Sequence, residues 1–204
     1  MMNNTEPTVY VVDDDDAVRD SLMDLVDSVG LKAEEFASAQ AFLDSYDEKR
    51  PGCLVLDIRM PGMSGLDLQD RLSEVGSVLP IIFITGHGDV PMAVRAMQRG
   101  AVDFIQKPFR DQELLDRINI ALEKGNQSFA VQEQVEEFAS RVGTLTQRER
   151  EVMEMIVNGK ANKVIAVDLG LSQRTVELHR ARVMEKMKAR TLADLVRMAT
   201  KVNR

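Results

Sequence analysis

The sequence lacks the marks of secreted, disulfide-bonded and membrane-embedded proteins. Cys53 is the single cysteine among 204 residues, so no disulfide bond can form within the chain. In the stretch GCLVLD it is most simply a small buried apolar residue. There is no signal-peptide pattern and no apolar run long enough to cross a bilayer. We therefore expect a soluble, cytoplasmic protein without membrane contacts.

Aromatic residues are also scarce, at 4% of the chain, and there is no tryptophan. The hydrophobic content is nevertheless 44%, which is normal for a globular protein with a buried core. We expect that core to consist mainly of aliphatic residues, methionine and alanine.

The net charge of −7 is unevenly distributed. Residues 144–204 contain 13 Lys+Arg and 7 Asp+Glu, a net charge of +6, whereas residues 1–143 carry −13. Such a division suggests two domains with different partners, and the basic one is a candidate for binding a polyanion.

Short apolar runs alternate with amphipathic stretches in the acidic part. The pattern predicts strands at 8–12, 32–36, 53–57, 80–85 and 101–106. It predicts helices near 16–29, 38–47, 65–75 and 90–99, and a fifth that begins near Asp111. Three of the strands are apolar almost throughout, as in strands covered on both faces. We therefore expect an α/β fold with a doubly wound, five-stranded parallel sheet.

Polar side chains follow four of these strands at the ends where parallel sheets build their sites. They are Asp13 and Asp14, Asp57, Thr85 and Lys107. Grouped carboxylates repel one another and favour a hard divalent cation such as Mg²⁺. Aspartate can accept a phosphoryl group, and a lysine and a hydroxyl are suitable partners for its oxygens.

The run of four aspartates, VVDDDD, has a second interpretation. Asp15 and Asp16 suit the acidic first turn of the helix that follows, where the helix dipole favours negative charge. Asp13 and Asp14 suit it less well, because they stand where the strand ends.

Residues 126–142 separate the acidic and basic parts. Gly125-Asn126 predicts a break or kink in the fifth helix. Val131, Val135 and Phe138 have helical spacing, so the linker is either partly helical or simply polar. The sequence leaves both possibilities open.

The basic part is helical by pattern. Thr146 and Glu149 form a capping box, and Gly159 ends that helix. A short helix at 161–168, a turn at Gly170 and a longer helix from Ser172 to about Lys188 have the proportions of a helix-turn-helix. Thr191 caps a last helix. The basic residues of the longer helix are either a solvated face or a DNA-binding surface, and the net charge favours DNA.

Taken together, these motifs resemble two-component response regulators of the NarL/FixJ type. The receiver signature appears as VVDDD, LVLDIRMPGMSG, ITGHGD and KPF. The LuxR-type signature appears as LTQREREV, NGKANKVIA and LSQRTVELHRARVMEKM. The resemblance implies a flavodoxin-like receiver at 1–125, a linker at 126–142 and a small all-α, LuxR-type helix-turn-helix domain at 143–204.

The resemblance also implies roles for individual residues. Asp57 would be phosphorylated by a sensor histidine kinase. Mg²⁺ would be bound by Asp14, Asp57 and the backbone carbonyl of Arg59, with Asp13 acting through water. Thr85, Lys107 and the switch aromatic Phe104 would respond to the phosphoryl group, and Lys107-Pro108 would be a cis peptide. We expect a homodimer of the phosphorylated form that binds promoter DNA and recruits RNA polymerase, as an activator and not as an enzyme.

The predicted DNA contacts follow from the longer helix lying in the major groove. Lys163, Ser172, Arg174, Thr175 and Arg182 would approach the DNA, with Arg174, Thr175 and Lys163 on the backbone. Glu177, Leu178 and Ala181 share a face that can reach base edges.

The sequence argues against two other classes of protein. An aspartyl phosphatase would carry a D-x-D nucleophile motif, but here the run is Asp57-Ile58-Arg59. A ligand-sensing LuxR-type regulator would need a pocket domain in place of an acid-rimmed parallel sheet.

Overall fold

The computed structural model describes residues 6–86 and 90–202. The chain divides into two compact units, Met1–Ala130 and Val131–Arg204, and each is described separately. Residues 87–89 of the ITGHGD motif lie outside the described residues.

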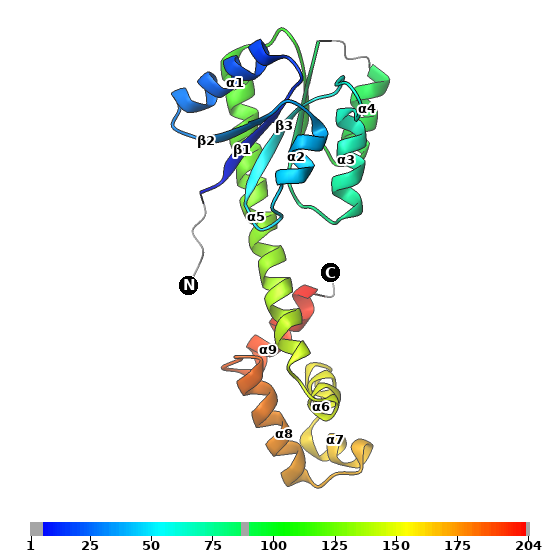
Figure 1. Cartoon of the computed structure of the whole chain (residues 1–204). Helices are drawn as coiled ribbons and strands as arrows, with labels where there is room; N and C mark the ends of the chain where they lie inside the picture. Colours follow the sequence, from blue (N-terminus) through cyan, green and yellow to red (C-terminus); the bar gives the residue numbers. More distant parts are fainter. Residues whose placement is uncertain (1–5, 87–89, 203–204) are drawn as a thin grey trace. The chain divides into compact units, whose positions relative to one another are not determined.

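The first unit is built on a five-stranded parallel sheet with the order β2-β1-β3-β4-β5 (Figure 1). The strands are β1 (Thr8–Val12), β2 (Lys32–Phe36), β3 (Gly52–Asp57), β4 (Ile81–Thr85) and β5 (Asp103–Gln106). Every residue of β1, β3 and β4 is buried, as their apolar sequences predict. The predicted fold class is confirmed, because the sheet has the expected strands.

Helices cover both faces of this sheet and create two hydrophobic cores (Figure 1). One core joins the sheet to α1 (Asp16–Ser28) and to the first part of α5 (Asp111–Gly143). The other core joins it to α2 (Ala39–Ser45), α3 (Gly65–Glu74) and α4 (Val90–Gln98). Covering both faces leaves the carboxyl ends of the strands as an open edge where side chains can form a site.

Helix α5 corrects the expected break at Gly125-Asn126, because it continues from Asp111 to Gly143. A Cβ atom at Gly125 would lie 2.4 Å from the carbonyl oxygen of Gly52. Gly125 therefore permits a close approach between helix and sheet and does not end the helix. Of the two possibilities left open for residues 126–142, the structure has the helical one.

The second unit contains α6 (Gln147–Val157), α7 (Asn162–Leu169), α8 (Gln173–Lys186) and α9 (Leu192–Val202). Phe138 and Val142, from the end of α5, pack against its hydrophobic core. Arg141 Nη1 also donates a hydrogen bond to the carbonyl oxygen of Met187, at 3.0 Å. Gly170 has φ +64° in the turn between α7 and α8, a conformation that glycine adopts without strain. In the described part of the chain, no helix is both long enough and apolar enough to cross a membrane.

Candidate functional site

The carboxyl ends of the strands bring the predicted receiver residues to one edge. Asp13 follows β1, and its N–H continues the pairing with β2 by donating to Phe36 O at 3.3 Å. Asp57 is the last residue of β3, and Thr85 is the last residue of β4. The N–H of Lys107, just beyond β5, donates to Thr85 O at 2.8 Å. The sheet register therefore places side chains from distant parts of the sequence together.

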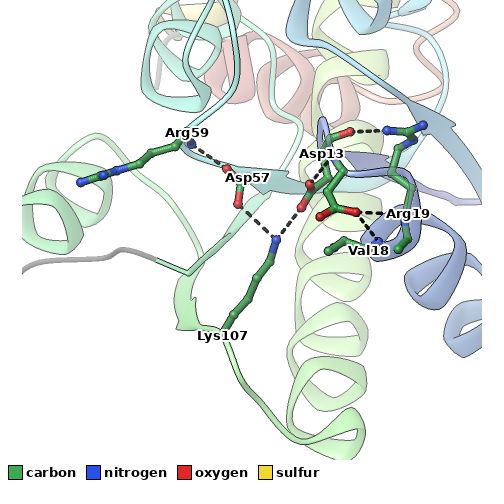
Figure 2. A network of polar contacts seen from close by, with 8 residues as sticks. Asp13, Val18, Arg19, Asp57, Arg59 and Lys107 are labelled. Atoms are coloured by element: carbon green, nitrogen blue, oxygen red, sulfur yellow. Dashed lines mark hydrogen bonds and ion pairs between the residues drawn. The ribbon is translucent and has the colours of Figure 1, made fainter.

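Lys107 reaches between two carboxylates (Figure 2). Its Nζ lies 2.6 Å from Asp13 Oδ2 and 3.2 Å from Asp57 Oδ1. Asp13 and Asp57 are both buried, with only 1% and 6% of their surface exposed. One ammonium group thus serves two carboxylates that water can hardly reach.

Backbone N–H groups also bind both carboxylates, through the oxygens that do not contact Lys107. Arg59 N donates to Asp57 Oδ2 at 2.6 Å, and Asp15 N donates to Asp13 Oδ1 at 3.0 Å. Both bonds fix the orientation of the carboxyl groups, and the bond from Arg59 favours the ionised form of Asp57.

The charges at this edge do not balance. Burial raises the pKa of Asp57, and the negative charge of Asp13 adds to that effect, while Lys107 and the Arg59 amide oppose it. Burial lowers the pKa of Lys107, but its hydrogen bonds and charge interactions with Asp13 and Asp57 outweigh burial and raise that pKa overall. The site has more carboxylate than it can compensate by itself, and this favours an additional cation.

The donor set fits Mg²⁺ better than a metal held by protein side chains alone. Among the described residues, no three His, Cys, Asp or Glu side chains are grouped so as to hold a metal. Mg²⁺ usually binds one or two carboxylates and keeps several water or phosphate ligands. Asp57 can supply a carboxylate oxygen, and Asp14, the exposed neighbour of Asp13, can supply another. The hard oxygen ligands at this edge are therefore of the type that Mg²⁺ requires.

The remaining receiver residues lie on the neighbouring strands. Thr85 is buried, with 1% of its surface exposed. Phe104 pairs with Phe83 across β4 and β5, and its partly buried ring packs against the core beneath α2, α3 and α4. Lys107-Pro108 is a cis peptide, as the resemblance predicted.

In the second unit, α7, the Gly170 turn and α8 form the predicted helix-turn-helix. Ser172 caps α8, because its Oγ accepts a hydrogen bond from Thr175 N at 3.1 Å. Glu177, Leu178 and Ala181 lie exposed on α8, and Leu178 has 53% of its surface exposed. These three side chains are therefore accessible to another molecule.

The basic residues of this unit divide into two groups. Lys163, Arg174 and Arg182 are exposed and make no hydrogen bond or ion pair with any described residue. Lys186 instead binds Glu149 Oε2 at 2.6 Å, and Arg180 donates to Asn162 Oδ1 at 3.1 Å. The first group is available to an external anion, whereas the second holds the helices together.

Two protein families match the chain. Residues 9–119 match the response regulator receiver domain, and residues 143–199 match the bacterial regulatory proteins of the luxR family. The chain belongs to the two-component response regulators. It is a transcription regulator with a receiver domain and a LuxR-type DNA-binding domain.

Relatives of this response regulator match along almost its whole length. It is 50% identical over 191 residues to the transcriptional regulatory protein FixJ of Azorhizobium caulinodans, which covers 94% of this chain and 90% of FixJ. It is 45% identical over 201 residues to the response regulator protein TmoT of Ectopseudomonas mendocina, covering 98% of this chain and 91% of TmoT. Among solved structures, the response regulator StyR is 44% identical with a TM-score of 0.83, covering 97% of this chain and 100% of StyR. Receiver domains of this type generally use Mg²⁺ for phosphorylation.

Sequence reasoning missed two residues that organise these sites. Arg19 on α1 donates a hydrogen bond to the backbone carbonyl oxygen of Asp13, and Lys186 on α8 neutralises Glu149. The spacing of Asp16 and Arg19, three residues apart on a helix, was a detectable signal for an ion pair. No local pattern linked Lys186 to Glu149, because the two residues are 37 positions apart.

Proposed function

We propose that this response regulator accepts a phosphoryl group on Asp57 from a sensor histidine kinase in the cytoplasm. The observation that carries this proposal is the arrangement of Asp57 at the end of β3, buried and in contact with Lys107. Asp13, the other carboxylate that Lys107 binds, lies one residue beyond the end of β1, whereas Asp57 is itself the last residue of β3.

The transfer requires a simple exchange of bonds. A carboxylate oxygen of Asp57 attacks the phosphorus of the phosphohistidine, a P–O bond forms, and the P–N bond breaks. The electron pair of the broken bond returns to the imidazole, which leaves as the neutral ring after taking up a proton. Lys107, already 3.2 Å from Asp57 Oδ1, stabilises the negative charge of the phosphoryl oxygens.

Asp14, Asp57 and the backbone carbonyl of Arg59 would hold Mg²⁺, and Asp13 would support it through water. Mg²⁺ bound there supplies positive charge to the carboxylates and to the phosphoryl oxygens. Asp13 keeps Lys107 in place through the 2.6 Å contact, so the ammonium group stays directed towards the acceptor.

Phosphorylation would act by shifting the population of receiver conformations. Thr85 would move towards the phosphoryl group, and Phe104 would turn inward into the space released. Helix α4 and strand β5 would change with them. Val90, Val94 and Met97 are exposed on α4, so this face has the apolar surface that a homodimer interface needs.

The homodimer would place two copies of α8 in successive major grooves of promoter DNA. Arg174, Thr175 and Lys163 would contact the DNA backbone, with Ser172 and Arg182 nearby. Glu177 would accept from cytosine N4, and Leu178 or Ala181 would meet a thymine methyl group. Bound in this way, the protein would recruit RNA polymerase and activate transcription.

The phosphorylation is tested by incubating the full chain with acetyl phosphate and Mg²⁺ and measuring its intact mass. We expect one added phosphoryl group on the wild-type protein and none on Asp57→Asn. Asp44→Asn, a change at an exposed carboxylate, is the matched control and should be labelled normally. Labelling of Asp57→Asn would place the acceptor elsewhere. A ligand sensor would gain no phosphoryl group, and a phosphatase would release phosphate with sustained turnover.

The DNA-binding surface is tested by titrating operator variants that differ at single base pairs. We expect Arg174→Ala to weaken binding to all of them similarly, because phosphate contacts carry no sequence information. We expect Glu177→Ala to relax the preference at one position by about 1–3 kcal/mol. An unchanged ranking of the variants after Glu177→Ala would contradict the assignment of this face to the base edges.

A further inference from the structure

Arg19 of α1 lies against the backbone of the acidic run and not in the proposed phosphorylation site itself. Its Nη1 donates to the carbonyl oxygen of Asp13 at 2.8 Å. Its other nitrogens pair with Asp16 and, at 3.5 Å, with Glu35 Oε2. Only 11% of the Arg19 side chain is exposed, so this guanidinium group is held in one place.

Because of Arg19, every polar group of Asp13 has a partner. The N–H donates to Phe36 O, Oδ1 accepts from Asp15 N, and Oδ2 accepts from Lys107 Nζ. The carbonyl oxygen accepts from Arg19. Figure 2 shows Asp13 between two positively charged side chains, with Lys107 on the side of Asp57 and Arg19 on the side of α1. The peptide that joins Asp13 to Asp14 therefore cannot rotate without breaking the bond to Arg19.

The remaining aspartates of the run also have defined tasks. Asp15 caps α1 by accepting from Ala17 N at 2.9 Å and Val18 N at 3.3 Å. Asp16 binds Arg19. Two carboxylates thus hold the start of α1 and its arginine, and this arrangement fixes the loop that presents the other two.

We propose that Arg19 is a positioning residue for the divalent cation at this site. It binds the carbonyl oxygen of Asp13 and so holds the Asp13-Asp14 peptide in the orientation that directs their carboxylates to the cation. The inference rests on the proposed function, because it assigns Arg19 a role towards the Mg²⁺ expected there. Residues that orient metal ligands from behind commonly change metal affinity by about 10–100-fold when they are replaced.

The test measures Mn²⁺ binding to the full chain by electron paramagnetic resonance, with Mn²⁺ as the probe for Mg²⁺. We expect Arg19→Gln to raise the dissociation constant about tenfold. Arg19→Lys keeps the positive charge but loses the planar fork of donors, so it should recover only part of the affinity. A dissociation constant for Arg19→Gln within twofold of the wild-type value would overturn the inference.

Arg50→Gln is the matched control. Arg50 is also a partly buried arginine with an acidic partner, Glu34, but it precedes β3 and lies at the opposite edge of the sheet. We expect Arg50→Gln to bind Mn²⁺ as the wild type does. Equal weakening by Arg50→Gln and Arg19→Gln would indicate a general loss of structure and overturn the positioning role.

A second measurement separates affinity from chemistry. Labelling by acetyl phosphate is followed as a function of Mg²⁺ concentration. We expect Arg19→Gln to need about ten times more Mg²⁺ for half-maximal labelling and to reach nearly the wild-type rate at saturation. A lower rate at saturation with unchanged Mg²⁺ dependence would overturn the inference. Failure of the wild-type protein itself to bind Mn²⁺ would instead overturn the proposed metal site, and the inference with it.

Discussion

Each unit of this response regulator contains a buried carboxylate bound by a lysine, but the two pairs differ in their charge balance. In the second unit, Glu149 Oε2 accepts from Lys186 Nζ at 2.6 Å and from Thr146 N at 2.9 Å. One carboxylate faces one lysine, and the hydrogen bond from Lys186, followed by that from Thr146, lowers the pKa of Glu149 to about 2. In the first unit, Asp13 and Asp57 share Lys107, and burial raises the pKa of Asp57.

The difference shows how the same chemical groups can serve stability or function. The ionised form of Glu149 is favoured in the folded state, so that pair stabilises the second unit. The ionised form of Asp57 is disfavoured there, so the first unit is less stable than its packing would allow. A site with surplus negative charge is prepared for a cation and a phosphoryl group, and functional sites commonly lower stability in this way.

The largest expected effect on stability is at the pair of Glu149 and Lys186, in which one negative charge faces one positive charge. Glu149→Gln should lower the free energy of unfolding of the second unit by about 1–3 kcal/mol, because Lys186 loses its charged partner. The measurement is a urea titration of the full chain followed by the amide NMR signals of Val183 in the second unit and Ile82 in the first. Glu154→Gln, at an exposed position of the same helix, is the control and should have little effect. A loss of stability no greater than that of the control would remove the contrast between the pairs.

The same pair should give the second unit a marked dependence on pH. Glu149 has a pKa of about 2 in the folded state and an ordinary value of 4.5. Its stabilising effect is therefore complete above pH 4.5 and is lost as the pH falls towards 2. Asp57 acts in the opposite direction, because a carboxyl group with a raised pKa binds its proton more tightly in the folded state.

Urea titrations between pH 5 and pH 2.5 test this difference. As the pH falls, the Val183 signal of the wild type should report a loss of stability of the second unit. The Glu149→Gln variant should show little of this loss. If the wild type and the variant show the same pH dependence in the second unit, another group is responsible.

A smaller effect on stability, of opposite sign, is expected in the first unit, where Asp13 and Asp57 share Lys107. Asp57→Asn should raise the stability of the first unit by about 1 kcal/mol, because it removes one of two negative charges beside Lys107. The Ile82 signal in the same urea titration measures the change. A destabilised first unit would mean that Lys107 compensates both carboxylates fully, and the proposed surplus of charge would be wrong.

The smallest effect concerns Lys188, a lysine near Lys186 whose backbone has φ +52°. Lys188→Gly should raise stability by less than about 1 kcal/mol, because glycine adopts this conformation without strain but costs more chain entropy. Lys188→Ala removes the ammonium group and keeps the strained Cβ atom, so it should change little. A large loss of stability in Lys188→Ala would show that the charge of this lysine matters. The expected contrast with Lys186, whose charge stabilises the unit, would then be wrong.

Local sequence patterns were sufficient for most of the fold. Apolar runs identified the central strands, and the polar residue at the end of each run identified the edge where Asp57 and Lys107 meet. The capping box of Thr146 and Glu149 was also evident from their spacing. Two contacts were not evident from the sequence. The close approach of Gly125 to Gly52 depends on tertiary packing, and the bond from the Arg19 side chain to the Asp13 carbonyl depends on the conformation of the loop between β1 and α1; no spacing of residue types encodes either.

The end of α5 has a practical consequence for dividing this protein into fragments. Phe138 and Val142 belong to the hydrophobic core of the second unit, and Arg141 binds the backbone at the end of α8. A DNA-binding fragment that starts at Thr144 would expose that core to water and leave the Met187 carbonyl without its donor. A fragment that starts at Val131 keeps these contacts, so the cut between the halves belongs inside the long helix, well before the region where helix-turn-helix similarity begins.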